Sequence, residues 1–168
     1  MGITYIPEDR QRQGLILPFT VRANLSLVIL RQLSRLGFIN GPAEENLARL
    51  FVSRLDIRTP GIDVPAGNLS GGNQQKVVVG KWLASDPRIL IMDEPTRGID
   101  VGAKAEIHRL VSDLARKGQG ILLISSELPE LLGMCDRILV MHRGRISGEL
   151  ARAEASQEKV MTLAMGIA

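Results

Sequence analysis

Two hydrophobic patterns alternate along the chain, and the alternation predicts its secondary structure. Short apolar runs bounded by Pro, Gly or charged residues are typical of strands, and they occur at 2–6, 89–93 and 121–124. Longer stretches with apolar residues three or four positions apart predict helices at 20–36, 40–55, 71–84 and 100–117. Strands that alternate with helices favour an α/β fold with a mostly parallel sheet and flanking helices. The run 121–124 is apolar throughout, so we expect that strand to be covered on both faces.

Capping residues mark the ends of these helices. Thr20 is a good N-cap and Gly37 a good stop for the first helix, whose apolar face would be Leu25, Val28, Ile29 and Leu33. The next helix begins at Asn40 with Pro42 in its first turn, and its apolar stripe would be Leu47, Leu50, Phe51 and Leu55. Asp100 is the expected N-cap of the helix that follows the second strand.

The last part of the chain has shorter elements. A short helix from Glu127 should precede two strands, 137–141 and 145–148, joined by a turn at Arg143 and Gly144. Ser156 is the expected N-cap of a final helix, 157–165.

Composition limits the classes of function. With 168 residues, 45% of them hydrophobic, the chain can fill one domain with a core. Its single cysteine, Cys135, excludes a disulfide framework, fits a reducing compartment, and reads best as a small buried hydrophobe. No run approaches the roughly 18 apolar residues of a membrane span, so we expect a cytosolic protein or one peripheral to the cytosolic face of a membrane. Net charge is +3 and aromatics are 3%, which argues against a nucleic-acid partner.

Candidate chemistry is concentrated in residues 68–102. The stretch 69–76 reads Leu-Ser-Gly-Gly-Asn-Gln-Gln-Lys, a Gly-Gly turn that opens a helix and can present backbone N–H groups to an anion. The second strand then ends in two adjacent acids, Asp93 and Glu94. Adjacent acids can divide their work, one holding a metal ion and the other orienting water.

Both motifs resemble those of ATP-binding-cassette (ABC) ATPases. Residues 69–76 resemble the signature motif, in the form found in carbohydrate importers, 89–94 the Walker B strand and 97–100 the D-loop. The resemblance covers residues 2–167 and is greatest to the second of two cassettes fused in ribose-, galactose- and xylose-type importers. The alternative from the residues alone is an ordinary α/β domain with a chance Gly-Gly turn.

The resemblance implies a role for each motif residue. In the family the signature acts on ATP bound to an opposite cassette, and the matching positions here are Leu69, Ser70, Gly71, Gly72, Asn73 and Gln74. Asp93 would bind Mg²⁺ with the nucleotide, Glu94 would orient water, and Asp100 would couple the two sites. Glu8 stands at the Q-loop position, where the family has glutamine, although the loop 7–14 also reads as a solvated turn. Ser126 stands at the position of the switch histidine, while His108 and His142 read as structural or solvated.

One motif of the family is missing from the sequence. No Gly-x-x-x-x-Gly-Lys-Ser/Thr pattern, the Walker A phosphate loop, occurs anywhere. The strand 2–6 lies well inside the domain in the family, so we expect a truncated nucleotide-binding domain over 1–168. The resemblance divides it into a helical subdomain at about 18–60, a part at 69–150 with the signature, Walker B, D-loop and switch region, and a C-terminal helix at 151–168.

Three hypotheses follow from this comparison of motifs. The chain is part of the ATPase of a sugar importer, and alone it should bind ATP poorly and hydrolyse almost none. Its partners would then be a second cassette with its own Walker A loop, transmembrane permease subunits and, indirectly, a periplasmic sugar-binding protein. Alternatively it is a non-catalytic module that lends its signature to another cassette, or a gene remnant. Upstream DNA would separate these, because an in-frame phosphate loop would make Met1 internal.

Overall fold

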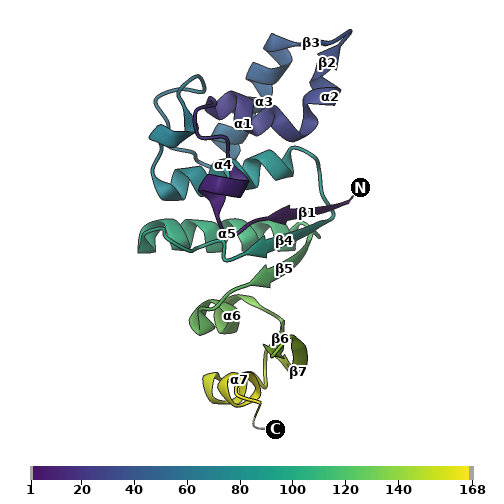
Figure 1. Ribbon diagram of the computed structural model, residues 1–168, viewed down its shortest axis with the longest axis vertical. Helices are drawn as coiled ribbons and strands as arrows, with labels where there is room; N and C mark the ends of the chain where they lie inside the picture. The colour runs from purple at the N-terminus through teal and green to yellow at the C-terminus, as the bar shows by residue number, and fades with distance from the viewer. Residues whose placement is uncertain (1, 167–168) are drawn as a thin grey trace. The chain divides into compact units, whose positions relative to one another are not determined.

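The computed structural model describes residues 2–166, which divide into two compact units at 2–124 and 125–166 (Figure 1). The first unit contains β1 (Ile3–Ile6), α1 (Val21–Ser26), α2 (Leu30–Leu33), β2 (Ser34–Arg35), β3 (Phe38–Ile39), α3 (Gly41–Arg54), α4 (Gly71–Leu83), β4 (Ile89–Asp93), α5 (Val101–Arg116) and β5 (Gly120–Ile124). The second contains α6 (Leu128–Met134), β6 (Arg137–His142), β7 (Arg145–Ala151) and α7 (Gln157–Ala164). Residues 167 and 168, the end of the expected C-terminal segment, lie outside the described residues.

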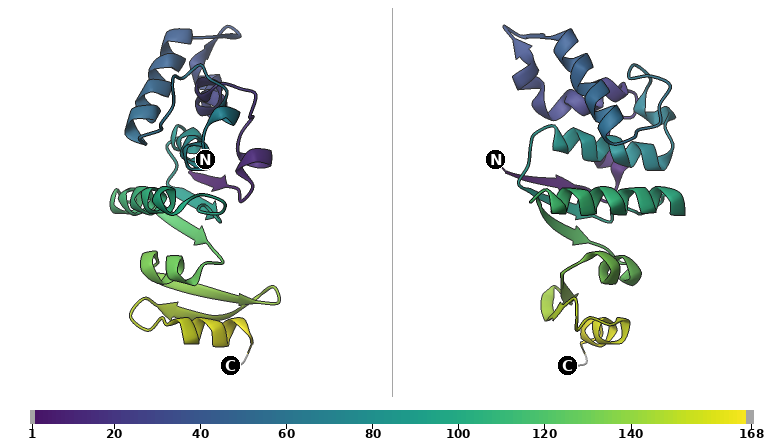
Figure 2. Two further views of the ribbon diagram at one scale, coloured as in Figure 1. Left: turned by 90° about the vertical axis from the view of Figure 1, so that its left-hand side faces the viewer. Right: turned by 180° about the vertical axis from the view of Figure 1, so that it is seen from behind.

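The first unit contains a parallel sheet in the order β1-β4-β5. Ile3 pairs with Ile89 and Ile89 with Gly120, so the strands lie level with one another. Helix α4 contacts β1 and helix α5 contacts β5 (Figures 1 and 2). The α/β class with a parallel sheet and flanking helices is therefore confirmed. The other ladders of the described residues, β2-β3 and β6-β7, are antiparallel.

The two faces of this sheet differ, which corrects the expectation for 121–124. Ile6, Leu90 and Met92 point to one face and are fully buried. Alternate positions point to the opposite face, and five large side chains there are 40–60% exposed: Ile3, Tyr5, Ile89, Leu122 and Ile124. Periodicity shows that a strand is apolar on both faces, but it cannot show what covers each of them.

The expected helix at 20–36 ends early. Thr20 caps α1 by accepting a hydrogen bond from Ala23 N, as predicted. The helix then tightens into a 3₁₀ turn, and α2 ends at Leu33. The next residues form a hairpin, because Leu36 and Gly37 adopt positive φ angles of 53° and 83° between β2 and β3. Gly37 thus serves a hairpin turn rather than a helix stop.

The apolar stripe of α3 agrees with the prediction only in part. Asn40 caps this helix by accepting from Ala43 N. Phe51 and Leu55 are buried as expected, but Leu50 is 57% exposed and Ala48 is fully buried instead. A small residue lies innermost because α1 packs directly against α3. The stripe is therefore core packing on only part of the predicted face.

Helix α4 is the most buried helix of the first unit. Val77, Val78 and Val79 are fully buried. Gly80 lies so near its neighbours that an added Cβ would be 2.8 Å from Leu25 Cδ2 and 2.9 Å from Leu55 Cδ1. The helix is thus fixed between the sheet and the helices α1 and α3, and this positions its N-terminal end.

The second unit has a small core of its own. Ile138, Val140 and Val160 are buried, and Cys135 packs against them partly buried. Burial, followed by the charges of Glu130 and Asp136, raises the pKa of the Cys135 thiol, in line with its interpretation as a hydrophobe. His142 Nδ1 donates to Ala164 O at 2.7 Å, which supports a structural role for that histidine.

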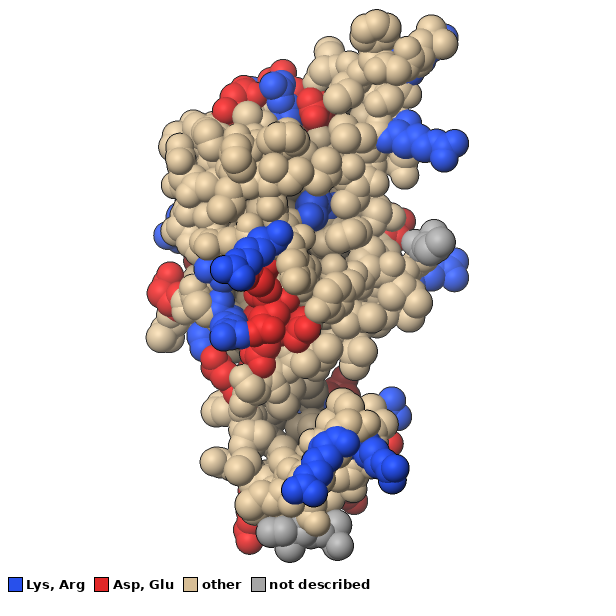
Figure 3. Space-filling view, in the orientation of Figure 1, with Lys and Arg blue, Asp and Glu red and all other residues tan. Residues whose placement is uncertain are grey.

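Two properties of the described residues concern partners. No helix among residues 2–166 is both long and apolar enough to cross a membrane. Basic and acidic side chains lie intermixed over the middle of the first unit on the face in Figure 3.

Candidate functional site

The Gly-Gly motif lies at the N-terminal end of α4, as its sequence predicts. Leu69 is buried and anchors the turn, while Ser70 is exposed and is the N-cap residue. Gln74 is also buried, and its Nε2 donates to Ala66 O at 3.3 Å. The motif therefore alternates between side chains that hold the turn in place and groups that face outward.

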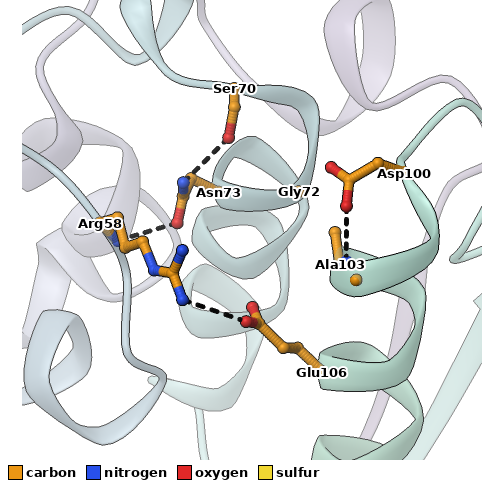
Figure 4. Close-up of a pocket in the computed structure, with 8 residues that line it drawn as sticks. Arg58, Ser70, Gly72, Asn73, Asp100, Ala103 and Glu106 are labelled. Carbon is orange, nitrogen blue, oxygen red and sulfur yellow. Dashed lines mark hydrogen bonds and ion pairs between the residues drawn. The ribbon is translucent and has the colours of Figure 1, made fainter.

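Ser70 does not cap its own helix. Its side chain accepts no bond from the backbone N–H groups of α4. Instead Asn73 Nδ2 donates to Ser70 Oγ at 2.9 Å, and Asn73 Oδ1 accepts from Arg58 N at 2.8 Å (Figure 4). The first N–H groups of α4 thus lack the side-chain acceptor that an N-cap usually provides.

The two glycines permit close approaches that larger residues would prevent. An added Cβ on Gly72 would lie 2.5 Å from Ala103 Cβ on α5. An added Cβ on Gly71 would lie 2.7 Å from Arg10 Nη2 and 3.3 Å from Gly98 O. The turn at residues 69–72, called the signature turn below, is therefore in direct contact with the start of α5 and with the loop after β4.

Arg10 connects these parts, a role that was not predicted from the sequence. Its Nη1 donates to Arg97 O at 2.8 Å and its Nη2 to Gly98 O at 3.0 Å. Arg10 begins a π-helical turn, Arg10–Gly14, in the segment expected to be a loop, and Asp9 caps this turn by accepting from Gln11 N and Arg12 N. One guanidinium thus joins the segment after β1 to the D-loop segment.

A shallow pocket of about 130 Å³ lies where the N-terminal ends of α4 and α5 meet, beside Arg58 (Figure 4). Asp100 lines it and caps α5, its Oδ1 accepting from Ala103 N at 2.9 Å, which confirms the predicted N-cap. Glu106 also lines it and pairs with Lys76 Nζ at 2.8 Å and with Arg58 Nη2 at 3.5 Å. The hydrogen bond from Lys76 is the main reason why the pKa of Glu106 is lowered.

The acid pair lies at the carboxyl end of β4. Tyr5 Oη donates to Asp93 Oδ2 at 2.7 Å, and this bond, with burial and the carboxylate charge, raises the pKa of Tyr5. Glu94 adopts a positive φ of 45°, uncommon for a non-glycine residue, and its N donates to Ile124 O at 2.8 Å. Strain of this kind is found preferentially at functional sites.

Asp93 and Glu94 offer carboxylate oxygens, the donor type that Mg²⁺ prefers. No group of three or more His, Cys, Asp or Glu side chains within residues 2–166 is arranged to hold a metal. Mg²⁺, however, often takes only one or two protein carboxylates and receives its other ligands from phosphates and water. Asp93, with Glu94 next to it, fits that kind of donor set and would hold the ion jointly with a nucleotide.

The other predicted residues lie in different surroundings. Glu8, at the Q-loop position, forms an ion pair with Arg97, so its charge is compensated within the first unit. Ser126 belongs to the second unit, where it is exposed just before α6. The structure thus pairs Glu8 with Arg97, whose carbonyl accepts from Arg10, and places Asp100 beside Ser70, Gly72 and Asn73 around the pocket.

Comparison with known proteins gives consistent matches. The ABC transporter family model matches residues 3–97. The ribose import ATP-binding protein RbsA of Oceanobacillus iheyensis is 55% identical over 98% of this chain and 33% of its own, and RbsA 2 of Rhizobium meliloti is 52% identical over 99% and 32%. The chain spans about a third of the length of these relatives.

Solved structures show the same fold. The ATP-binding cassette MJ1267 of an ABC transporter has a TM-score of 0.77 and 26% identity over 96% of this chain and 68% of its own. A nucleotide-free ATP-binding cassette from an ABC transporter has a TM-score of 0.72 and 24% identity over 98% of this chain and 65% of its own.

Proposed function

The chain belongs to the ABC transporter family, and from this premise we propose that it is the signature-bearing part of the ATP-binding component of a ribose-type sugar importer. It would act on the cytoplasmic face of a membrane, with permease subunits and, through them, a periplasmic sugar-binding protein. The names of the relatives, ribose import ATP-binding proteins, support the substrate class. Within the chain, residues 18–60 would form the helical subdomain that contacts the permease, and 69–150 the part that serves the nucleotide.

The exposed N-terminal end of α4 is the observation that carries this proposal. The backbone N–H groups after Ser70 have no side-chain cap and lie at the positive end of a 13-residue helix. An anion is the natural acceptor for such a group of donors. The terminal phosphate of an ATP molecule bound to a second cassette would meet Ser70 Oγ and the amides of Gly71 and Gly72.

The acid pair would act on a different nucleotide, the one bound on this chain's own side. Asp93 would hold Mg²⁺, and the ion would supply positive charge to stabilise the negative charge that develops on the phosphate. Glu94, next to it at the end of β4, would orient the attacking water. Tyr5 holds one oxygen of Asp93, which leaves the other to face the ion.

Phosphate binding on this side needs a loop that the sequence does not contain. Without a Walker A motif no lysine and hydroxyl are available to hold the β- and γ-phosphates. We therefore expect the chain alone to hydrolyse no ATP beyond the level of its Glu94→Gln variant. Turnover by the purified chain that Glu94→Gln abolishes would contradict this expectation.

The trans role needs a second experiment with a phosphate loop present. The full chain is joined in frame in place of the matching segment of the Oceanobacillus iheyensis protein, and ATP hydrolysis is measured. Ser70→Ala should lower kcat on the order of 10²-fold, the usual effect of losing one donor to a developing charge. Ser112→Ala, an exposed serine on α5, is the matched control and should leave kcat unchanged. Equal kcat values for both variants would refute the role of the signature turn.

A further inference from the structure

We propose that Asn73 is a positioning residue, which fixes the direction of the Ser70 hydroxyl so that its proton points toward the nucleotide. The inference rests on the proposed function, because it describes how the signature turn is prepared to meet a phosphate. It concerns a side chain that need not touch the nucleotide itself.

The orientation of the Asn73 amide is determined by its partners. Its Oδ1 lies 2.8 Å from Arg58 N, and only an oxygen can accept from a backbone N–H. The amide NH₂ therefore faces the other way, where Nδ2 lies 2.9 Å from Ser70 Oγ. Figure 4 shows the side chain of Asn73 between Arg58 and Ser70, with both bonds drawn.

This orientation of Asn73 determines where the hydroxyl proton of Ser70 can point. An NH₂ group donates and cannot accept, so Ser70 Oγ is the acceptor in this bond. The hydroxyl hydrogen must then point to another acceptor. Ser70 also lacks the hydrogen bond that an N-cap side chain usually makes, because its Oγ accepts from no backbone N–H of α4. The side chains of Thr20, Asn40, Asp100 and Ser156 all perform that task for their helices.

The backbone at Arg58 is a firm point of attachment. Two residues earlier, Asp56 O accepts from Lys76 Nζ at 2.7 Å, and this lysine is buried in α4. The Arg58 side chain itself lies 3.5 Å from Glu106 on α5, and Glu106 also binds Lys76. The segment 56–58 is thus held to α4 through Asp56 and to α5 through the Arg58 side chain. A residue held in this way needs no rearrangement when a phosphate arrives.

A positioning role for Asn73 predicts an effect on kcat and little effect on KM. If Asn73 only orients a donor, its loss affects the step in which charge develops on the phosphate and leaves nucleotide capture to the other cassette's phosphate loop. We expect Asn73→Ala to lower kcat about 10-fold and to leave KM for ATP within about twofold, both measured in the in-frame fusion described above.

Two further variants separate orientation from packing. Asn73→Asp keeps the acceptor for Arg58 N but cannot donate to Ser70, so it should lose at least as much kcat as Asn73→Ala. The double variant Ser70→Ala/Asn73→Ala should be no slower than Ser70→Ala alone, because an absent hydroxyl cannot be misdirected. Asn46→Ala, an exposed asparagine on α3, is the matched control and should be neutral.

The outcomes separate the two proposals. A wild-type kcat for Asn73→Asp, or losses that multiply in the double variant, would overturn the positioning role while Ser70→Ala remains impaired. A wild-type kcat for Ser70→Ala would instead overturn the proposed function. The same substitutions are made in the isolated chain, where the fluorescence of Trp82, its single tryptophan and part of α4, verifies that each variant is folded.

Discussion

Replacing Gly72 by alanine tests whether the contact between α4 and α5 is as close as the structure shows. The new methyl carbon would lie 2.5 Å from Ala103 Cβ, whereas carbon atoms at their best separation are about 3.5–4.0 Å apart. The first turns of the two helices would have to separate by about 1 Å. Neither atom belongs to a flexible side-chain end that could turn aside, so the helices themselves must move.

The size of the effect follows from two opposing terms. Overpacking a fixed contact costs about 1–3 kcal/mol. Alanine is a better helix former than glycine by about 0.5–1 kcal/mol, which offsets part of this cost. We expect Gly72→Ala to lower the free energy of unfolding by up to about 2.5 kcal/mol, with a central value of about 1 kcal/mol. Ala103→Gly removes the obstructing methyl group, so Gly72→Ala should cost nothing in its presence.

The assay is a double-mutant cycle by urea unfolding, followed by the fluorescence of Trp82. Gly41→Ala is the matched control, because Gly41 also lies in the first turn of a helix but has open space around it. It should be neutral or slightly stabilising. If Gly72→Ala and Gly41→Ala had equal effects, or if Ala103→Gly failed to rescue the former, the close contact would be wrong.

Three more predictions address single side chains. Tyr5 is the only tyrosine, and its pKa is raised above 10.0, so Asp93→Asn should lower the tyrosinate absorbance midpoint toward 10.0; an unchanged midpoint would mean that the bond is absent in solution. Since a raised folded-state pKa favours the neutral phenol, the stability from this bond is present below pH 10.0 and is lost as pH rises through the folded-state pKa. Asn24 is fully buried and bonds the backbone of Ile16 through both N–H and C=O, so Asn24→Leu should cost at least about 2 kcal/mol by urea unfolding; a cost below about 0.5 kcal/mol would contradict this. Cys135 should react with a thiol reagent at least about tenfold more slowly in the folded protein than in urea, because burial raises its pKa, and equal rates would refute that.

Local signals predicted much of the fold. The helix expected at 100–117 is α5, Val101–Arg116, because a capping aspartate and a regular apolar period specify both its ends and its face. The predicted end of the helix at 20–36 was wrong, because the apolar periodicity continues to Leu36 whereas the backbone turns into a hairpin there. That turn depends on a positive φ, which a leucine gives no reason to expect.

The candidate site, like the fold, was predicted only where the signal is local in the sequence. Residues 69–74 were found because they are contiguous and their order is specific. The contacts of Arg10 and Arg58 were not predicted, because the fold brings both residues to the motif from other parts of the chain. The bond between Tyr5 and Asp93, which are 88 residues apart, could not be predicted without the register that pairs β1 with β4.

The bare side of the three-stranded sheet has a consequence for handling the protein. Ile3, Leu122 and Ile124 stay in contact with water there, and covering such surface releases about 25 cal/mol for each Å². In a concentrated preparation, a second molecule of the same protein can cover this apolar face by self-association. Colloidal behaviour should therefore depend steeply on concentration, and dilution or a mild detergent should keep the material monodisperse.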